Sequence, residues 1–245
     1  SGSTYTYGTA GTATIGGTTT GNLTLDGTVY NTGTAAYEAA SNKKILITQA
    51  NPIFRGDSRA SDTIKFETAA VDISDGTLSV ITQGKDIVFE GAIASTDSGA
   101  NEIVTLTTGG STGQVTVTAI GGSSKIASVG IEGATVSLGG NITTMAVGGV
   151  QVTGAASLAA DSTITTTTNN GIVSFSSTID GGQNFDIVSG GSGAVTISGN
   201  IGNGTALTTL DINRSAGTGA ITLSGNIGKT DGTAGSGATF IGNDG

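Results

Sequence analysis

The residue types that carry out most acid–base and nucleophilic chemistry are missing from this chain. Its 245 residues include no histidine and no cysteine. This excludes a Ser-His-Asp triad, a histidine-ligated metal site and a thiolate nucleophile. The 18 acidic residues are too scattered to nominate an acid–base pair. No catalytic residue is therefore predicted, the chain is not expected to be an enzyme, and a polysaccharide-cleaving enzyme that uses two carboxylates is the least favoured alternative.

One tripeptide, Arg55-Gly56-Asp57, has the residue types of a receptor-binding turn. In a tight turn its guanidinium and carboxylate lie on opposite sides, where they could bridge a receptor carboxylate and a metal ion. The tripeptide follows Pro52 within a charged part of the chain. Arg55, Gly56 and Asp57 are therefore the candidate receptor-binding residues, and the alternative is a chance tripeptide in a surface turn.

Three aspartates have a placement that could attract a cation. Asp72, Asp186 and Asp211 each lie between two apolar residues, so in a strand each side chain is expected to point to solvent. If these side chains stack in register they could recruit calcium, and otherwise they are ordinary solvated acids. Calcium is the one cofactor considered, and its ligands are left unassigned.

Charge and hydropathy narrow the choice of partners. The net charge of −9 repels phosphate backbones and anionic lipid, so nucleic acid is not expected as a partner. No apolar run approaches the length of a membrane-spanning helix, so no transmembrane segment is predicted. The first residues are typical of a processed end, so any targeting segment is expected to have been removed.

Short apolar patterns recur along the chain at intervals of 22 and 26 residues. Gly193–Gly202 reappears almost letter for letter as Gly219–Gly228, and Val173–Ile179 is a degenerate earlier copy. The shared pattern is apolar-x-apolar-x-Gly-x-apolar. Its period of two puts apolar side chains on one face, and its glycine allows a bend. The pattern also fits Leu23–Val29, Ile87–Ile93 and Val136–Ile142.

This repeat predicts an all-β fold, a parallel β-helix (β-solenoid) over most of the chain, in which coils of about 24 residues stack. An antiparallel β-sandwich gives no reason for a repeated decamer, and the regular apolar spacing argues against disorder. Composition divides the chain into three zones. They are a Gly/Thr-rich N-terminal strand segment (1–37), a charged and less regular β region forming coils, a cap or a subdomain (38–102), and a repetitive β-solenoid (103–245).

The repeats Ala194–Gly202 and Ala220–Gly228, in a chain rich in Gly, Thr, Ser and Asn, resemble β-strand repeats of bacterial surface proteins. They look like autotransporter passengers and filamentous-haemagglutinin-type adhesins. The resemblance implies a non-enzymatic, exported protein at the bacterial cell surface. Self-association into a filament or surface layer is the favoured role. The alternative is a monomeric adhesin passenger whose charged 38–102 region binds a host receptor or glycan.

Overall fold

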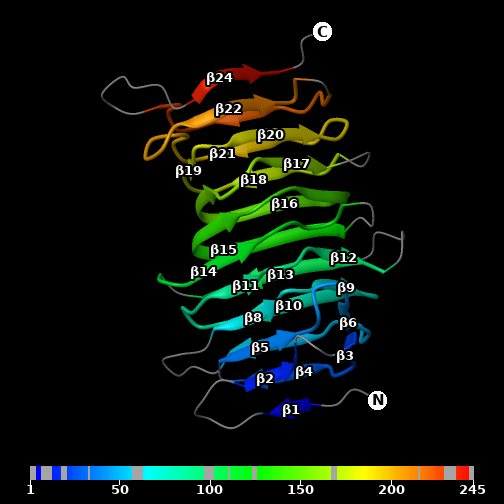
Figure 1. Cartoon of the computed structure of the whole chain (residues 1–245). Helices are drawn as coiled ribbons and strands as arrows, with labels where there is room; N and C mark the ends of the chain where they lie inside the picture. The colour runs from blue at the N-terminus through cyan, green and yellow to red at the C-terminus, as the bar shows by residue number, and fades with distance from the viewer. Residues whose placement is uncertain are drawn as a thin grey trace.

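The chain winds into a parallel β-solenoid, and the part of it that the structure describes contains only strands, turns and loops (Figure 1). The computed structural model describes residues 4–6, 13–17, 21–32, 34–56, 63–96, 102–109, 111–122, 126–166, 170–214, 216–228 and 236–242. The described strands pair in parallel with the strands one coil before and one coil after them. The prediction of a parallel β-helix is therefore confirmed.

Three ladders of strands form the walls of the solenoid, which we call faces A, B and C. Face A is built, in order along the axis, from β1 (Thr4–Thr6), β4 (Val29–Thr32), β7 (Ile53–Gly56), β10 (Thr77–Ile81), β13 (Ile103–Thr107), β15 (Ile126–Leu138), β16 (Ile142–Leu158), β18 (Val173–Phe175), β21 (Val195–Ile197) and β23 (Ile221–Leu223). Its parallel pairing fixes which side chains of successive coils lie above one another.

Face B follows face A in each coil, and face C follows face B. Face B contains β2 (Ala13–Gly16), β5 (Ala35–Glu38), β8 (Ile64–Glu67), β11 (Ile87–Phe89), β14 (Gln114–Val117), the later parts of β15 and β16, and β19 (Ile179–Asp180). Face C contains β3 (Leu23–Leu25), β6 (Lys44–Ile47), β9 (Ala70–Ile73), β12 (Ile93–Ser95), the start of β16, β17 (Ser162–Thr166), β20 (Asn184–Ser189), β22 (Leu207–Ile212) and β24 (Ser236–Ile241).

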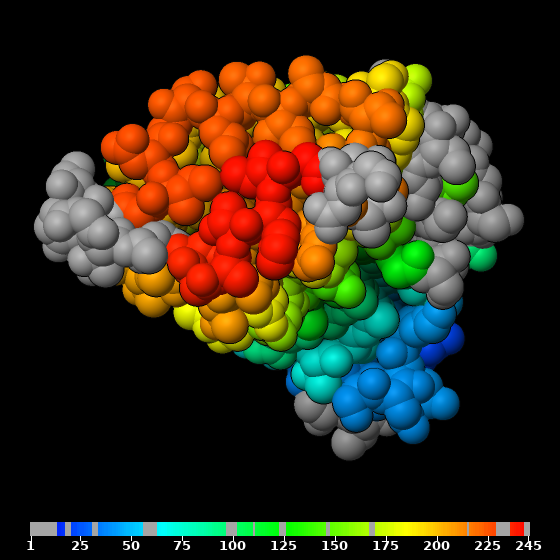
Figure 2. Space-filling view, turned by 90° about the horizontal axis from the view of Figure 1, so that it is seen from above, coloured from blue at the N-terminus to red at the C-terminus, as the bar shows by residue number. Residues whose placement is uncertain are grey.

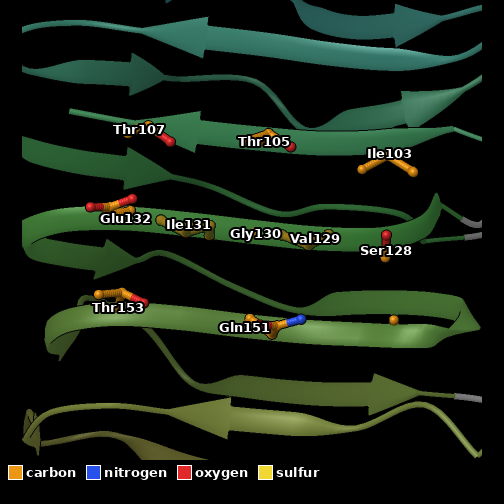
Figure 3. A pocket seen from close by; sticks show the side chains of 11 residues that line it. Ile103, Thr105, Thr107, Ser128, Val129, Gly130, Ile131, Glu132, Gln151 and Thr153 are labelled. Atoms are coloured by element: carbon orange, nitrogen blue, oxygen red, sulfur yellow. The ribbon is translucent and has the colours of Figure 1, made fainter. Parts of the chain in front are cut away.

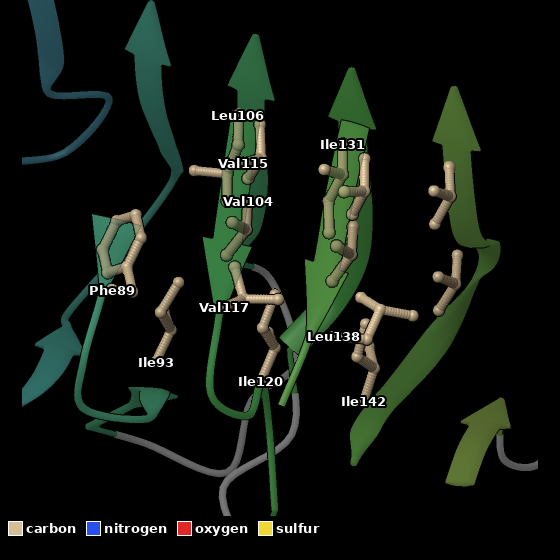
Figure 4. Packing of buried hydrophobic residues seen from close by; sticks show 14 of the residues in the cluster. Phe89, Ile93, Val104, Leu106, Val115, Val117, Ile120, Ile131, Leu138 and Ile142 are labelled. Atoms are coloured by element: carbon tan, nitrogen blue, oxygen red, sulfur yellow. The ribbon is translucent and has the colours of Figure 1, made fainter. Parts of the chain in front are cut away.

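The core is a set of apolar columns that run along the axis. Alternate residues of each strand point inward, so that in β13 Val104 and Leu106 are buried while their neighbours line the outside. Figure 4 shows how side chains from faces A, B and C meet in the interior. One column on face C runs through isoleucines 93, 120, 142, 164, 187 and 212, which pair coil after coil. Because every coil adds one residue to each column, the core extends with the chain.

Aromatic rings fill the core of the N-terminal half. Tyr30 stacks on Phe54 with ring centroids 4.5 Å apart, and Phe66 stacks on both Tyr37 (5.0 Å) and Phe89 (4.4 Å). Phe54 also meets Phe66 edge-on at 5.3 Å. Ring pairs of this kind contribute about 0.5–1.5 kcal/mol each beyond the area they bury. The aromatic side chains therefore stabilise the stacking of the coils between residue 30 and residue 89.

The repeated decamers stack directly on one another, as their offset predicts. Val195 pairs with Ile221, and Ile201 pairs with Ile227 one coil later. These copies form corners between faces A and B. The copies at Ile87–Ile93 and Val136–Ile142 instead lead from face B to face C, and Leu23–Val29 leads from face C to face A. The pattern therefore specifies a corner of the coil, and it occurs at all three kinds of corner: A to B, B to C and C to A.

The charged zone from residue 38 to residue 102 contributes strands to the same ladders. Face C strands of this zone (β6, β9 and β12) form a separate four-stranded sheet with the preceding β3, in the order β12-β9-β6-β3. The boundary at 37/38 lies inside β5, which pairs with β2 on one side and β8 on the other. The strands of this zone are therefore part of the solenoid wall.

Asn and Asp side chains at the corners hold successive coils together. The Asn141 Oδ1 atom accepts a hydrogen bond from the backbone N–H of Thr163 at 2.9 Å, and Asn200 Oδ1 accepts one from Asn226 at 2.9 Å. A backbone N–H that leaves the ladder at a corner needs such an acceptor. The same kind of bond joins Asn22 to Lys44, Asn51 to Thr77, Asp86 to Gln114, Asp161 to Asn184, and Asn170 to Ser192.

Candidate functional site

The candidate receptor-binding tripeptide lies at the end of β7 on face A. The Arg55 side chain is exposed, in register with Asn31 of β4 and Ile81 of β10. Gly56 is the last residue of β7, and Asp57 lies outside the described residues. The relative placement of the guanidinium and the carboxylate is therefore not described, and receptor binding by this tripeptide stays a prediction.

Asp72 does not point to solvent, contrary to the expectation from its apolar neighbours. The residue is only 5% exposed, and its Oδ2 atom accepts a 2.5 Å hydrogen bond from Lys44 Nζ on the preceding coil. Lys44 opens β6 and pairs with the first residue of β9, which brings its side chain within reach of the carboxylate. Asp72 is thus held in an ion pair within the wall and is separated from the other two aspartates.

Other charges of this zone also pair with each other. Lys65 Nζ on face B lies 2.8 Å from Glu67 Oε1 and 2.7 Å from Glu90 Oε1. The hydrogen bond to Glu67, followed by that to Glu90, raises the pKa of Lys65. The hydrogen bond from Lys65 lowers the pKa of Glu90. These side chains are partly exposed, so the Lys65–Glu90 pair is a modest brace between coils, while the Lys65–Glu67 pair lies within β8.

Asp186 and Asp211 do stack in register, on β20 and β22 of face C. Burial raises the pKa of the Asp186 carboxyl, and the neighbouring carboxylates of Asp211 and Asp161 raise it further. Asp161 is itself engaged, because both its oxygens accept 2.8 Å hydrogen bonds from Asn184. Among the described residues no group of three or more acidic side chains is arranged to hold a metal ion. Asp211 Oδ2 also lies 4.0 Å from Arg214 Nη1. Calcium binding by these aspartates stays a prediction.

A groove of about 290 Å³ lies on the outside of face A, where β13, β15 and β16 run side by side (Figure 3). Its floor is β15, and its rims are the outward side chains of β13 and β16. Thr105, Gly130 and Gln151 form one outward column across these strands, and Thr107, Glu132 and Thr153 form the next. The groove is therefore lined by hydroxyl, amide and carboxylate groups from three successive coils.

Gly130 makes this hollow. It lies in the middle of β15, and its backbone does not adopt a positive φ. A methyl group added there would meet no atom within 4 Å. Its column neighbours Thr105 and Gln151 both carry side chains, so the missing side chain leaves a gap between them. No apolar or glycine repeat in the sequence singles out this position, because the gap exists only once three coils are in register.

The C-terminal end of the solenoid exposes apolar side chains. Figure 2 looks down on this end, where β24 (red) lies across the coil formed by the residues before it (orange). Ile227, Phe240 and Ile241 are 36%, 38% and 44% exposed, and they supply three of the four exposed large hydrophobic residues in the described chain. The fourth is Ile103, at one end of the face A groove. Three of these four residues therefore lie near the C-terminal end, and one lies at the side-wall groove.

No known protein family, curated protein or solved structure matches this chain. Nothing in the described chain forms a helix of the length and apolar character that a membrane crossing requires.

Proposed function

We propose that this protein is a non-enzymatic structural subunit of the bacterial cell surface that stacks end to end into filaments or a surface layer. The observation that carries the proposal is the exposed end of the solenoid. In the described chain the edge strands β23 and β24 have a partner on one side only. No described strand pairs with their outer edges, and Ile227 and Ile241, which end two core columns, are exposed.

The opposite end of the solenoid has the matching geometry. The first strands β1, β2 and β3 also pair on one side, with β4, β5 and β6. The two edges of a parallel ladder present complementary rows of backbone donors and acceptors. Leu23 begins the face C column that ends at Ile241, so a second copy stacked on this end continues the same column.

Such a contact joins two different surfaces of the subunit. A head-to-tail interface that does not close on itself adds copies without limit and produces a filament. Strand addition across the junction supplies main-chain hydrogen bonds, and the apolar columns supply burial. A surface location is proposed from the resemblance to β-strand repeats of bacterial surface proteins. Protease shaving of intact cells tests this part separately, because a subunit inside the cell would survive it.

Electron microscopy and sedimentation of matched lysine variants test the stacking. The substitution Ile227→Lys places a charge at the open end, where a stacked copy would bury it, and should abolish filaments. The control is Ile103→Lys, a residue of nearly equal exposure (37% against 36%) on the side wall. Filaments in wild type and in the control, with short rods in Ile227→Lys, are the expected result. A wild-type protein that stays monomeric, or filaments that persist in Ile227→Lys, would refute end-to-end stacking.

A further inference from the structure

The glycine at the centre of the face A groove has no structural role that the fold explains. Glycine inside a strand costs conformational entropy on folding and leaves a strand position without a side chain to pack. Of the neighbouring glycines in β15 and β16, Gly149 and Gly154 adopt a positive φ, and Gly133 and Gly148 lie against backbone or side-chain atoms. Gly130 does neither, and it lies outside the two register shifts between β15 and β16, so a bulge does not account for it. Close approach of a ligand to the backbone is a further reason for a glycine inside a strand.

The lining of the groove narrows the chemistry of that ligand. The backbone groups of β13, β15 and β16 are used in the ladder between these strands, so the groove offers side chains and no free sheet edge. The polar side chains Thr105, Gln151 and Thr153 both donate and accept hydrogen bonds. Glu132 is the one charged residue among those that line the groove. A peptide strand has no edge to join here, and an anionic ligand is repelled by Glu132.

The apolar part of the lining is small and lies at one end. Ile103, exposed to 37%, offers a single aliphatic surface beside Ser128. The floor from Ser128 to Glu132 is five residues of extended strand, and the four steps between them span about 13 Å. A ligand that fits is therefore extended, rich in hydroxyl groups, without negative charge, and carries a small C–H face.

We propose that this groove binds a short segment of a neutral oligosaccharide, laid along β15 over Gly130. In this arrangement Ile103 contacts the C–H face of one sugar ring. Gln151, Thr105 and Glu132 exchange hydrogen bonds with ring hydroxyls from the two rims and the floor. The site lies on the side wall, so it stays open when subunits stack through their ends and is independent of that stacking.

Saturation-transfer NMR with defined tetrasaccharides tests the proposal, because it detects ligand binding to single subunits and to large assemblies alike. The probes are cellotetraose, chitotetraose and mannotetraose, with tetragalacturonate as the acidic comparator. At least one neutral probe is expected to bind with a dissociation constant of about 1 mM, since the groove has no aromatic side chain and few convergent polar groups. The acidic comparator is expected to bind at least tenfold more weakly.

The decisive variant is Gly130→Thr, which places a side chain in the groove and whose Cβ would meet no atom within 4 Å. It should melt at or above the wild-type temperature, because threonine suits a strand better than glycine, and yet lose at least tenfold in affinity. The matched control is Ser174→Thr, which adds a methyl group in the same outward column of face A, two coils further on. This control should bind like wild type. Absence of binding by all three neutral probes, or undiminished binding by Gly130→Thr, would overturn the proposal.

Discussion

The aromatic column in the N-terminal half leads to a quantitative prediction, because the same substitution can be made inside and outside it. Phe66 and Phe175 are both fully buried on strands of the solenoid. Phe66 contacts three rings, with centroids at 5.0 Å (Tyr37), 5.3 Å (Phe54) and 4.4 Å (Phe89). Phe175 contacts one ring, that of Phe185 at 5.6 Å.

Replacing either phenylalanine by leucine removes a similar apolar area, so the difference between the variants reports on ring contacts. Phe66→Leu loses two more ring pairs than Phe175→Leu. At about 0.5–1.5 kcal/mol for each pair, it should lower the free energy of unfolding by about 1–3 kcal/mol more. Both sites lie away from the ends of the solenoid, so neither variant alters the proposed stacking surface.

Urea unfolding followed by circular dichroism measures the total loss in the free energy of unfolding. Native-state hydrogen exchange shows which coils are destabilised. The Glu90 amide donates to the Phe66 carbonyl at 3.0 Å, and the Ser198 amide donates to the Phe175 carbonyl at 2.9 Å. These two amides report on the opening of the coil next to each substitution. Equal losses in the two variants would show that the stacked rings add nothing beyond buried area, and the reasoning would then be wrong.

Three further predictions concern the corners and the wall. Asn141→Ala should cost about 1 kcal/mol in urea unfolding, because it removes a side-chain acceptor for the next coil, whereas the exposed Asn203→Ala should cost nothing measurable. Asp186→Asn should raise the free energy of unfolding by about 0.5 kcal/mol at pH 7, since it removes cross-strand repulsion. The raised pKa of Asp186 means that the folded protein takes up this proton more readily than the unfolded chain, so wild type gains stability as the pH falls. The advantage of the variant in thermal melts should therefore vanish at pH 3, and an advantage that persists there would contradict the assignment. Gly91→Ala should reduce soluble yield and melting temperature sharply, because its Cβ would lie 2.1 Å from a backbone oxygen of the preceding coil, whereas Gly130→Ala should melt like wild type.

The decamer offset predicted the stacking of coils because the spacing of apolar residues directly reflects the length of a coil. Val195 and Ile221 pair as that offset requires. The pattern could not assign each copy to a corner, since apolar-x-apolar-x-Gly-x-apolar describes only a local bend. Which face a strand joins depends on how many corners precede it, and Ile87–Ile93 therefore turns a different corner from the decamers.

The surface features were harder to predict, because they depend on residues from different coils. Asp72 has the alternation of an exposed residue, yet Lys44 on the preceding coil covers it. The groove over Gly130 needs Thr105 and Gln151 at its rims, 25 and 21 residues away in the chain. Local period and residue type predict which side of a strand faces the core. They do not report what the neighbouring coil places beside each outward position.

The same corner pattern occurs at all three kinds of corner, so whole coils of this solenoid are interchangeable units of sequence. One coil separates Val195 from Ile221 along the axis. If residues 195–220 were deleted, Ile221 could pair with Val173, which now pairs with Val195. Unequal recombination between such segments would shorten or lengthen the product by whole turns and preserve every contact elsewhere. The length of the solenoid along its axis could then change by whole coils, while the cross-section of each coil stays the same.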